Sequence, residues 1–570
     1  MYLCNNFEKK LFNGMKQKMK LLWLLLGAAA FITSCSKSVP KEIKYIPKDA
    51  FVVLGMDLKS LSEKSKAANI NWDSLMKASI DDAADYQEGK KKWDELRTSG
   101  IDTAGRLYMF VKMGGSIMNG QSSSVGFVGG LNDVTKFEAY VNSQSPEGGI
   151  KKESNYSHAR MHNMNIGWNS EVVIVSLVNM GYSENSESQS TASADQMLAT
   201  IFAQKETDAV SSIPEFAELN EEKSDMIFWT NSTSATAAIP FIGVTKLADL
   251  LKDSYTASTI NFENGKIEAN CKSYSNKTLA DILKKYAGPT VDMDMVNKYP
   301  AQADGFTTFS FKPELLVELI KFSGFDGMAN QQLAEMGLTL DDLAKLFKGD
   351  FAIIFSDIHE EEKPNTYDPE IKMKEPTGSL VFDAKIGDKA LYDKVAAKLY
   401  EKGLMEKNGN MYVPKNLSGE GNSWSVTDKD MVIATDSALL NQYLAGNAGK
   451  ANIPSDIAAL TKGKSVAFYL NINKILEAFS SAEPNSQTLT NAKQVFKDMY
   501  ATVGNFDGKQ TNSVFALRTM NDNENSLTTL IKFIIKESKE IKSAEQSMHG
   551  GMTDIDSTEV TPITPPAEKP

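Results

Sequence analysis

The sequence is poor in the side chains that most often carry catalysis or bind metals. It contains four histidines and three cysteines among 570 residues. It has no G-x-S-x-G motif, no Walker loop and no G-x-G-x-x-G run, so the common signatures of serine hydrolases and nucleotide-binding proteins are missing. Cys4 and Cys35 lie close to the N-terminus, which leaves Cys271 alone in the body of the chain. No internal disulfide is therefore expected, and stability must come from packed cores.

Long hydrophobic runs and an excess of positive charge are also lacking. Beyond the N-terminal region, no stretch approaches the roughly 18 consecutive apolar residues of a transmembrane helix. The net charge is -12. An acidic body repels phosphate backbones, so nucleic acid is not an expected partner. The hydrophobic share of 42% and the charged share of 24% are typical of a globular protein. A chain of 570 residues predicts at least two domains.

The strongest functional signal lies before residue 36. Three lysines between positions 16 and 20 precede the apolar run Leu21–Phe31, which is too short to span a bilayer as a mature helix. The residues Ile32–Cys35 (ITSC) then complete the pattern of a signal peptide. The end of this segment resembles a bacterial lipobox, in which the cysteine thiol is acylated and the chain is cut just before it. Cys35 is therefore the predicted lipidation site.

These signals divide the start of the chain into three parts. Residues 1–14 precede a second methionine, Met15, and are expected to lie upstream of the true start. Residues 1–34 as a whole are assigned to the signal peptide and whatever precedes it. Residues 35–44 are polar and form a lipidated tether of at most about 30 Å. The acyl chains on Cys35, of the palmitate type, would hold the protein on a membrane.

The remainder of the sequence reads as two similar halves. A strand that leads into a helix is predicted for Phe51–Leu61 and again for Phe306–Leu316. A second strand–helix unit, Val125–Val141, has its counterpart in Leu380–Ala396. Because the units recur in the same order, we predict a tandem duplication. The alignment pairs Val53 with Thr308, Phe127 with Phe382, Asp133 with Asp388 and Trp168 with Trp424.

The predicted fold class is α+β, with two tandem similar domains at residues 45–290 and 300–542. Many of the strands pair through hairpins, which favours a mainly antiparallel sheet in each domain with helices on one face. The cleft between the two domains is then the expected place for a ligand. Residues 543–570 are polar and end in a proline-rich stretch, so we expect a disordered tail.

Three finer expectations concern turns and insertions. Asn264-Gly265 predicts a two-residue type I′ hairpin turn. The matching hairpin of the second half is expected to turn at residues 521–525. The serine-rich segment Tyr182–Asp195 has no counterpart in the second half and is expected to form a surface loop, since turns accept extra residues at little entropic cost.

The chain resembles a family of Bacteroidota lipoproteins known as domain of unknown function 4836. The resemblance rests on the lipobox at Cys35, the opening Tyr45–Ala50 (YIPKDA) and the duplicated strand–helix plan. It implies no known substrate, cofactor or catalytic residue. Surface-displayed lipoproteins of Bacteroidota resemble one another in carrying acidic residues after the cysteine, whereas Ser36–Ser38 here is neutral to basic. The expected location is therefore the outer membrane, lipid-anchored and facing the periplasm.

Few clusters in the sequence suggest chemistry. His158 and His162 could suit a soft metal, but their alternation places them on one strand face about 13 Å apart. His359 heads an acidic loop without the HExxH spacing. Ser74–Lys77 matches the S-x-x-K of penicillin-binding enzymes, but no K-T-G follows it. We predict no metal site, no cofactor and no catalytic residue.

Two tryptophans and one cysteine need an interpretation of their own. Trp168 and Trp424 occupy matching positions of the two halves and are interpreted as hairpin or core residues. The alternative is that both serve as a platform on which a ligand stacks. Cys271 falls in an alternating strand, where a buried and inert thiol is expected.

The predicted function is that of a non-catalytic cell-envelope lipoprotein, which binds or scaffolds in the periplasm. Its expected partners are the membrane, through the N-terminal lipid, and an envelope protein or a small apolar ligand. Two alternatives stay open. One is an envelope glycan or peptide hydrolase that uses carboxylates in the inter-domain cleft, because such a pair leaves no sequence signature. The other is a carrier of lipids or other apolar ligands.

Overall fold

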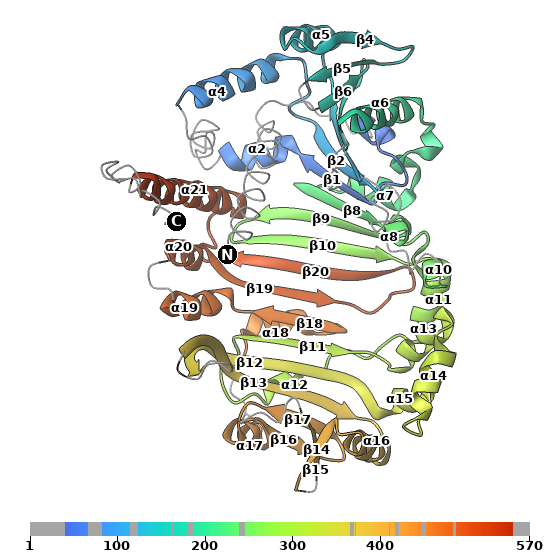
Figure 1. The fold of residues 1–570 in the computed structure, drawn as a ribbon, viewed down its shortest axis with the longest axis vertical. Coiled ribbons are helices and arrows are strands. Elements are labelled where there is room, and N and C mark those ends of the chain that lie inside the picture. Colours follow the sequence, from blue (N-terminus) through green and yellow to red (C-terminus); the bar gives the residue numbers. More distant parts are fainter. Residues whose placement is uncertain are drawn as a thin grey trace, which may run out of the picture.

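The computed structural model describes residues 40–550 except for the internal segments 67–82, 114–122, 162–163, 179–186, 239–245, 365–369, 371, 410, 416–420, 447–451 and 483–485. Cys35, His162 and Ser74–Lys77 lie outside the described residues. Within the described part, eighteen strands form one sheet that runs along the molecule, and every strand pair in it is antiparallel (Figure 1).

Ten strands belong to the first half of the chain and ten to the second. The first ten are β1 (Val52–Asp57), β2 (Arg106–Lys112), β3 (Ser124–Gly130), β4 (Glu147–Lys152), β5 (Ser157–Met161), β6 (Met164–Trp168), β7 (Val172–Val178), β8 (Met226–Asn231), β9 (Tyr255–Glu263) and β10 (Lys266–Tyr274). The others are β11 (Gly305–Ser310), β12 (Phe347–Pro364), β13 (Lys372–Ile386), β14 (Met405–Asn408), β15 (Met411–Pro414), β16 (Ser423–Val426), β17 (Asp430–Ala434), β18 (Val466–Leu470), β19 (Phe496–Val503) and β20 (Gln510–Thr519). Strands β14 and β15 form a separate hairpin.

Eight strands follow the same order in the two halves, and the first half adds β4 and β5 at its outer edge. From its outer edge, the first half runs β4-β5-β6-β7-β3-β2-β1-β8-β9-β10. The second half runs β16-β17-β13-β12-β11-β18-β19-β20. The two runs meet where β10 pairs with β20, from Lys266 opposite Arg518 to Tyr274 opposite Gln510. We call this strand pair the seam. Sequence analysis predicted a sheet in each half with a cleft between them, but the seam joins the halves in one sheet.

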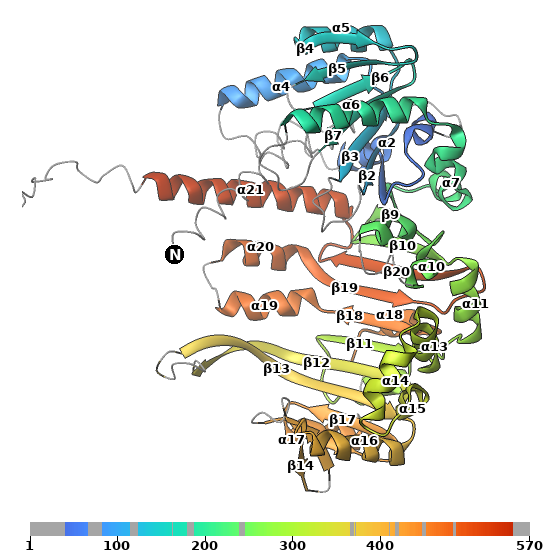
Figure 2. The same ribbon diagram turned by 45° about the vertical axis from the view of Figure 1, so that its right-hand side comes forward.

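Helices lie at both ends of the strands (Figure 2), and in the first half they also pack on both faces of the sheet. In the first half they are η1 (Lys41–Tyr45), α2 (Leu58–Lys66), α4 (Ala83–Thr98), α5 (Val134–Ser143), α6 (Glu187–Ala203), η3 (Glu206–Asp208), η4 (Val210–Ser212), α7 (Pro214–Glu221), α8 (Ser232–Ala238), α10 (Leu247–Leu251) and α11 (Lys277–Lys285). In the second they are α12 (Met293–Asn297), α13 (Glu314–Ser323), α14 (Asp326–Ala334), α15 (Leu340–Leu346), α16 (Lys389–Glu401), α17 (Ser437–Ala445), α18 (Ser455–Thr461), α19 (Ile472–Ala482), α20 (Gln487–Val495) and α21 (Ser526–Gly550).

Two cores lie on opposite sides of the first half. On β2, the neighbouring residues Leu107 and Tyr108 point to opposite faces. Tyr108 joins a core with residues of η1, α6, η4 and α7, whereas Leu107 packs with Met56 and with Leu61 of α2. The prediction of helices on one face is therefore wrong for this half. A strand buried on one side by η1, α6 and α7 still has an apolar second side, which α2, α4 and α5 partly cover.

The main core of the second half lies under α12, α17 and α18. It contains Phe306 and Tyr469 from the sheet and Tyr443 from α17. Helices α13–α16 form smaller clusters beside it, at one end of the strands. In Figure 1 the central strands β9, β10, β20 and β19 are seen face-on, with α19–α21 at one end of the strands and α10, α11 and α13 at the other.

Helix starts follow the sequence closely. The Asp133 carboxylate accepts the N–H of Lys136 at 3.0 Å and begins α5, and Asp388 accepts the N–H of Leu391 at 2.9 Å and begins α16. The aspartates that aligned in the sequence are thus the N-caps of corresponding helices. Such caps satisfy backbone N–H groups that have no partner inside the helix.

Four local expectations were wrong. The predicted tether already forms η1, with Ile43 buried in the core. The predicted loop Tyr182–Asp195 enters α6 at Glu187, and α21 continues into the predicted disordered tail as far as Gly550. Only Gly265 of the Asn264-Gly265 turn has a positive φ, of 71°, so the turn is not type I′.

The repeat alignment also needs two corrections of register. Val53 lies opposite Trp229 in the first half. The residue that matches Trp229 in the second half is Tyr469, and it lies opposite Phe306. Val53 therefore corresponds to Phe306, two positions before the predicted Thr308. The counterpart of the Asn264-Gly265 turn joins β19 to β20 at residues 504–509, whereas residues 521–525 lead into α21. Local patterns repeat every second residue in a strand, so a slip of two leaves the pattern unchanged and cannot be seen in sequence.

Candidate functional site

One row of side chains crosses eleven neighbouring strands on a single face of the sheet. Directly opposed residues on adjacent strands point to the same side, so the row can be followed from pair to pair. It runs from β2 to β13 through Leu107, Met56, Met226, Ile260, Ala269, Phe515, Ala501, Phe468, Thr307, Ile353 and Phe382. Only Thr307 in this row is polar. We call this side of β1, β2, β8–β13 and β18–β20 the open face.

The open face is apolar and yet largely uncovered. Phe515 at the seam is 39% exposed, Ile353 on β12 is 37% exposed, and Leu380 on β13 is 38% exposed. Ile260, Ala269 and Phe468 are half-buried. Only the end of the row at Leu107 and Met56 is buried, beneath α2. Soluble proteins rarely leave so long a contiguous apolar surface exposed, and such surfaces mark places where another apolar group binds.

The polarity of the seam strands identifies the uncovered side as the unusual one. On β10, Ile267, Ala269 and Cys271 lie on the open face. Lys266 and Glu268 alternate with them on the other side and form an ion pair of 2.6 Å. That opposite side between the two main cores is therefore charged, which suits water. The apolar side is nevertheless exposed at the seam, where Phe515 is 39% exposed.

Aromatic rings gather on the open face in the second half. The rings of Phe309 and Phe351 stack with centroids 5.0 Å apart, and Phe311 lies 6.1 Å from each of them. Phe382 lies 6.4 Å from Phe351 on the next strand. These half-buried rings offer an apolar contact surface whose members support one another.

A cavity of about 200 Å³ lies at the first-half end of this face, where α4 and α5 cover the sheet. Its floor includes Leu107, Phe127 and Val175, and its roof includes Leu96 and Phe137. Twelve of its fifteen lining residues are apolar or glycine, the three others being Asp102, Arg106 and Tyr140. The cavity and the open face therefore offer similar chemistry, one beneath helices and one on the exposed sheet.

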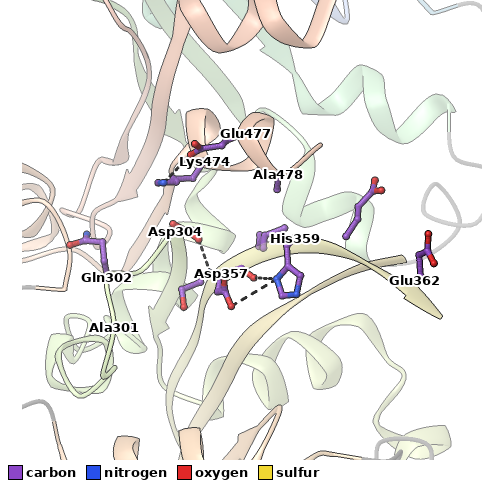
Figure 3. A pocket seen from close by; sticks show the side chains of 12 residues that line it. Ala301, Gln302, Asp304, Asp357, His359, Glu362, Lys474, Glu477 and Ala478 are labelled. Carbon is purple, nitrogen blue, oxygen red and sulfur yellow. Dashed lines mark hydrogen bonds and ion pairs between the residues drawn. The ribbon is translucent and has the colours of Figure 1, made fainter. Parts of the chain in front are cut away.

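A polar pocket of about 570 Å³ lies elsewhere in the second half, at the ends of β11 and β12 (Figure 3). The Asp304 carboxylate accepts the N–H of Asp357 at 2.8 Å, and the Lys474 ammonium contacts Glu477 at 2.9 Å. His359 Nδ1 lies 2.8 Å from the carbonyl oxygen of Asp357. Burial raises the pKa of the Asp304 carboxyl, while the Asp357 N–H and Lys474 act against it.

This polar pocket is where the carboxylates of the hydrolase alternative would have to act. Asp304, Lys474 and Glu477 already have hydrogen-bond or ion-pair partners, and the pocket lies within the second half, away from the seam. The corresponding pocket of the first half is lined by Lys112, Asn231 and Asp49 and has a different set of polar groups. Among the described residues, no group of three or more His, Cys, Asp or Glu side chains is arranged to hold a metal ion.

The sequence matches one protein family. A family model described as "Domain of unknown function (DUF4836)" matches residues 43–527. The match spans both halves of the sheet and the seam. The chain belongs to the DUF4836 family.

Other comparisons add little to the family assignment. No curated protein matches the DUF4836 chain. Two solved structures, "crystal form I of TP0453" and "crystal form III of TP0453", align at 8% and 11% identity. Each alignment covers 45% of this chain, and 90% and 91% of the other chain, with TM-scores of 0.23 and 0.22. At these scores the similarity does not establish a shared fold.

The DUF4836 structure buries both candidate tryptophans. Trp168 is 1% exposed and packs edge-on against Phe137 at 5.4 Å, and Trp424 is 8% exposed. Neither ring offers a free face, so the platform interpretation fails and the core interpretation holds. The two residues also differ in register. Trp424 lies opposite Ile433, whereas Trp168 lies opposite Val173, one alternate position further along.

Three further expectations can be placed in the DUF4836 fold. Cys271 is half-buried on the open face, so the expected burial of its thiol is wrong. His158 lies on β5 within 3.5 Å of Glu153, with a side chain 12% exposed. Within the described residues, no helix is both long and apolar enough to cross a bilayer.

Sequence reasoning missed the open face and one buried acid of this DUF4836 protein. The alternation of Lys266–Tyr274 was visible, but nothing local tells which side of a strand a helix will cover. Asp383 on β13 is completely buried beside Tyr443. The signal that could have found it is its position next to Phe382 in an otherwise apolar strand.

Proposed function

We propose that this protein is a non-catalytic, lipid-anchored envelope protein that binds the acyl chains of lipids on its open face. The observation that carries the proposal is the apolar row from Ile260 to Phe382, which crosses the centre of the sheet and leaves Phe515 39% exposed and Ile353 37% exposed. Covering apolar surface is favourable by about 25 cal/mol per Å². A protein that leaves this face exposed gains that free energy only when a ligand covers it.

The chemistry of the face favours hydrocarbon over a peptide strand. In the order in which the row crosses the sheet, every strand from β1 through the seam to β12 has a hydrogen-bonded neighbour on both sides. The backbone groups of these strands are therefore already paired. A peptide that binds by strand addition needs an unpaired sheet edge. An acyl chain has no polar groups to satisfy, and it can lie across apolar side chains without hydrogen bonds.

The anchor at Cys35 supports a membrane as the source of these chains. The first described residue is Pro40, and five peptide units between it and Cys35 span at most about 18 Å. With Ile43 in the core, the body would sit close to the bilayer. We place it on the periplasmic face of the outer membrane, following the neutral to basic Ser36–Ser38. Equal partition of wild type and Cys35→Ala between detergent and water would remove the anchor from this proposal.

We also propose that the two halves are tandem domains that arose by duplication. The shared strand order and the matched N-caps Asp133 and Asp388 support this reading. Phe127 and Phe382 occupy the same place, because Phe127 lies opposite Met109 on β2 and Phe382 lies opposite Ile353 on β12. The duplication doubles the length of the apolar face, which one half alone would end at its own last strand.

The test is binding of a fluorescent long-chain fatty acid to the chain that starts at Ser36. Phe515→Lys and Ile353→Lys place a charge on the open face and should weaken binding at least tenfold. The control is Leu404→Lys, because Leu404 is 59% exposed but lies in the turn before β14, away from the face. Wild-type affinity in both open-face variants would refute the proposed function.

A further inference from the structure

The cavity at the end of the open face has three polar side chains in its lining, those of Asp102, Arg106 and Tyr140. The Asp102 carboxylate accepts the N–H groups of Ala104 at 3.0 Å and Gly105 at 3.1 Å. The Arg106 guanidinium donates to the carbonyl oxygens of Asn220 at 2.8 Å and Glu222 at 3.1 Å. Asp102 Oδ1 and the Arg106 guanidinium are therefore engaged with the backbone, and the rest of the lining is apolar except for Asp102 Oδ2 and the Tyr140 hydroxyl.

Such a cavity suits neither water nor a peptide. A buried water needs two to four polar partners, and a peptide brings backbone groups that must be paired. An apolar cavity of about 150 Å³ in another protein stays dry and binds benzene. With about 200 Å³ and the same kind of lining, this cavity has room for a hydrocarbon of roughly eight carbon atoms.

The cavity adjoins the open face. Phe127 on the cavity floor lies directly opposite Met109, and Met109 lies opposite Leu54. Leu54 in turn lies opposite Phe228 on β8. These three residues are half-buried and share the open side of the sheet. An alkyl chain on the open face can therefore continue into the cavity while it stays on the same side of the sheet.

We propose that this cavity is a binding pocket for the terminal methylene segment of a single alkyl chain. The inference extends the proposed function, on which its biological role rests, but it concerns a separate site that short alkyl compounds can fill on their own. The pocket recognises the chain end by its shape and by a lining in which twelve of fifteen residues are apolar or glycine.

Gly129 offers a way to close the pocket without disturbing the fold. It lines the cavity, and a Cβ placed there would meet only Leu107 Cδ1 at 3.6 Å and Val173 Cγ1 at 3.8 Å, which are ordinary contacts. Gly129→Leu fills the space with its own side chain. Gly327→Ala on α14 is the matched control, because a Cβ there meets no atom within 4 Å and lies outside the cavity lining.

The experiment titrates the chain from Ser36 with 1-bromooctane and follows tryptophan fluorescence, which bromine quenches at short range. Trp168 is a reporter beside the cavity, because its ring lies 5.4 Å from that of the lining residue Phe137. Wild type and Gly327→Ala should show saturable quenching. Gly129→Leu should need at least tenfold more ligand, and Gly129→Ala should fall between them.

The outcomes separate this inference from the proposed function. Unchanged saturable quenching in Gly129→Leu, with a wild-type melting temperature, would overturn the pocket. Loss of long-chain fatty acid binding in Phe515→Lys alongside that result would leave the open face as a ligand site without the pocket. If Gly129→Leu fails to fold, the graded change in Gly129→Ala decides, because that substitution makes only ordinary contacts.

Discussion

Asp383 and Tyr443 form a buried pair whose hydrogen atoms can be counted. The Tyr443 hydroxyl oxygen lies 2.7 Å from the carbonyl oxygen of Met295 and 2.7 Å from Asp383 Oδ2. A hydroxyl has one proton, and the carbonyl can only accept. Both contacts are hydrogen bonds only if Asp383 is protonated and donates to Tyr443. Burial raises the pKa of the Asp383 carboxyl, in agreement with that assignment.

Asp383→Asn should therefore remove a pH dependence of stability. The raised folded-state pKa means that the folded protein binds more protons than the unfolded chain above the ordinary value of about 3.9. The free energy of unfolding then falls as pH rises from that value to the folded-state pKa. An amide stays neutral, so the variant should lose this slope and equal or exceed wild type by about 1 kcal/mol at pH 7.

Urea unfolding between pH 4 and pH 8 measures this effect. Asp428→Asn is the control, since Asp428 is exposed in the turn between β16 and β17. A variant that loses 3 kcal/mol or more at neutral pH (about the cost of breaking a buried charged pair) would mean that Asp383 is ionised. Val128 occupies the corresponding place on β3, opposite Tyr108 as Asp383 is opposite Ala352, and it is buried too.

Two of the three glycines of β3, Gly126 and Gly129, face opposite sides of the sheet. A Cβ on Gly126 would collide with the ring of Phe110, which covers that glycine in the main core. A Cβ on Gly129 would meet only ordinary contacts in the cavity. The same strand therefore contains one position where glycine is required and one where it leaves space.

Gly126→Ala should destabilise the protein by about 1–3 kcal/mol, the usual cost of overpacking a core. Gly129→Ala should be neutral or stabilising, because glycine weakens a strand and the new methyl group finds room. Thermal unfolding of the two variants side by side measures the difference. Equal destabilisation would show that the two faces of β3 are packed alike, against the described structure.

The elements that sequence predicted best are those set by local chemistry. The strands around Phe127 and Phe382 and the N-caps Asp133 and Asp388 follow from alternation and capping, which need only neighbouring residues. Other features depend on contacts with distant strands. These are the register of Val53, the helix α6 and the conformation of the Asn264-Gly265 turn. Which face stays open also depends on them, so the candidate site could not be predicted.

At the scale of the whole molecule, the seam makes the two halves one structural unit. It pairs β10 and β20 along their full length, from Lys266 to Tyr274. The chain between the halves, in contrast, passes through exposed residues at Pro289 and Thr290. The connection that holds the halves together is therefore the strand pair and not the linker.

A protease site inserted between Pro289 and Thr290 tests this. After cleavage, the two fragments should still elute as one particle in size-exclusion chromatography and unfold in a single transition. An uncut sample with the same insertion is the control. Fragments that separate in native buffer, each with its own melting temperature, would show two independent domains.

The register of the seam has one more property. Asn270 of β10 lies opposite Val514 of β20. On one side of this pair Cys271 lies opposite Ser513, and on the other side Ala269 lies opposite Phe515. The strand pairs that lead from β8 to β10 and from β18 to β20 make Cys271 the counterpart of Phe515, and Asn270 the counterpart of Val514. The central pair, Asn270 and Val514, thus consists of two equivalent residues, and the pairs on either side of it exchange places, which is the signature of an isologous interface around a two-fold axis. A chain with only one half could build the same sheet as a homodimer, by pairing its last strand with that of a second copy. Gene fusion of such a dimer would fix its stoichiometry and free the two copies to diverge, as buried Val128 and Asp383 have done.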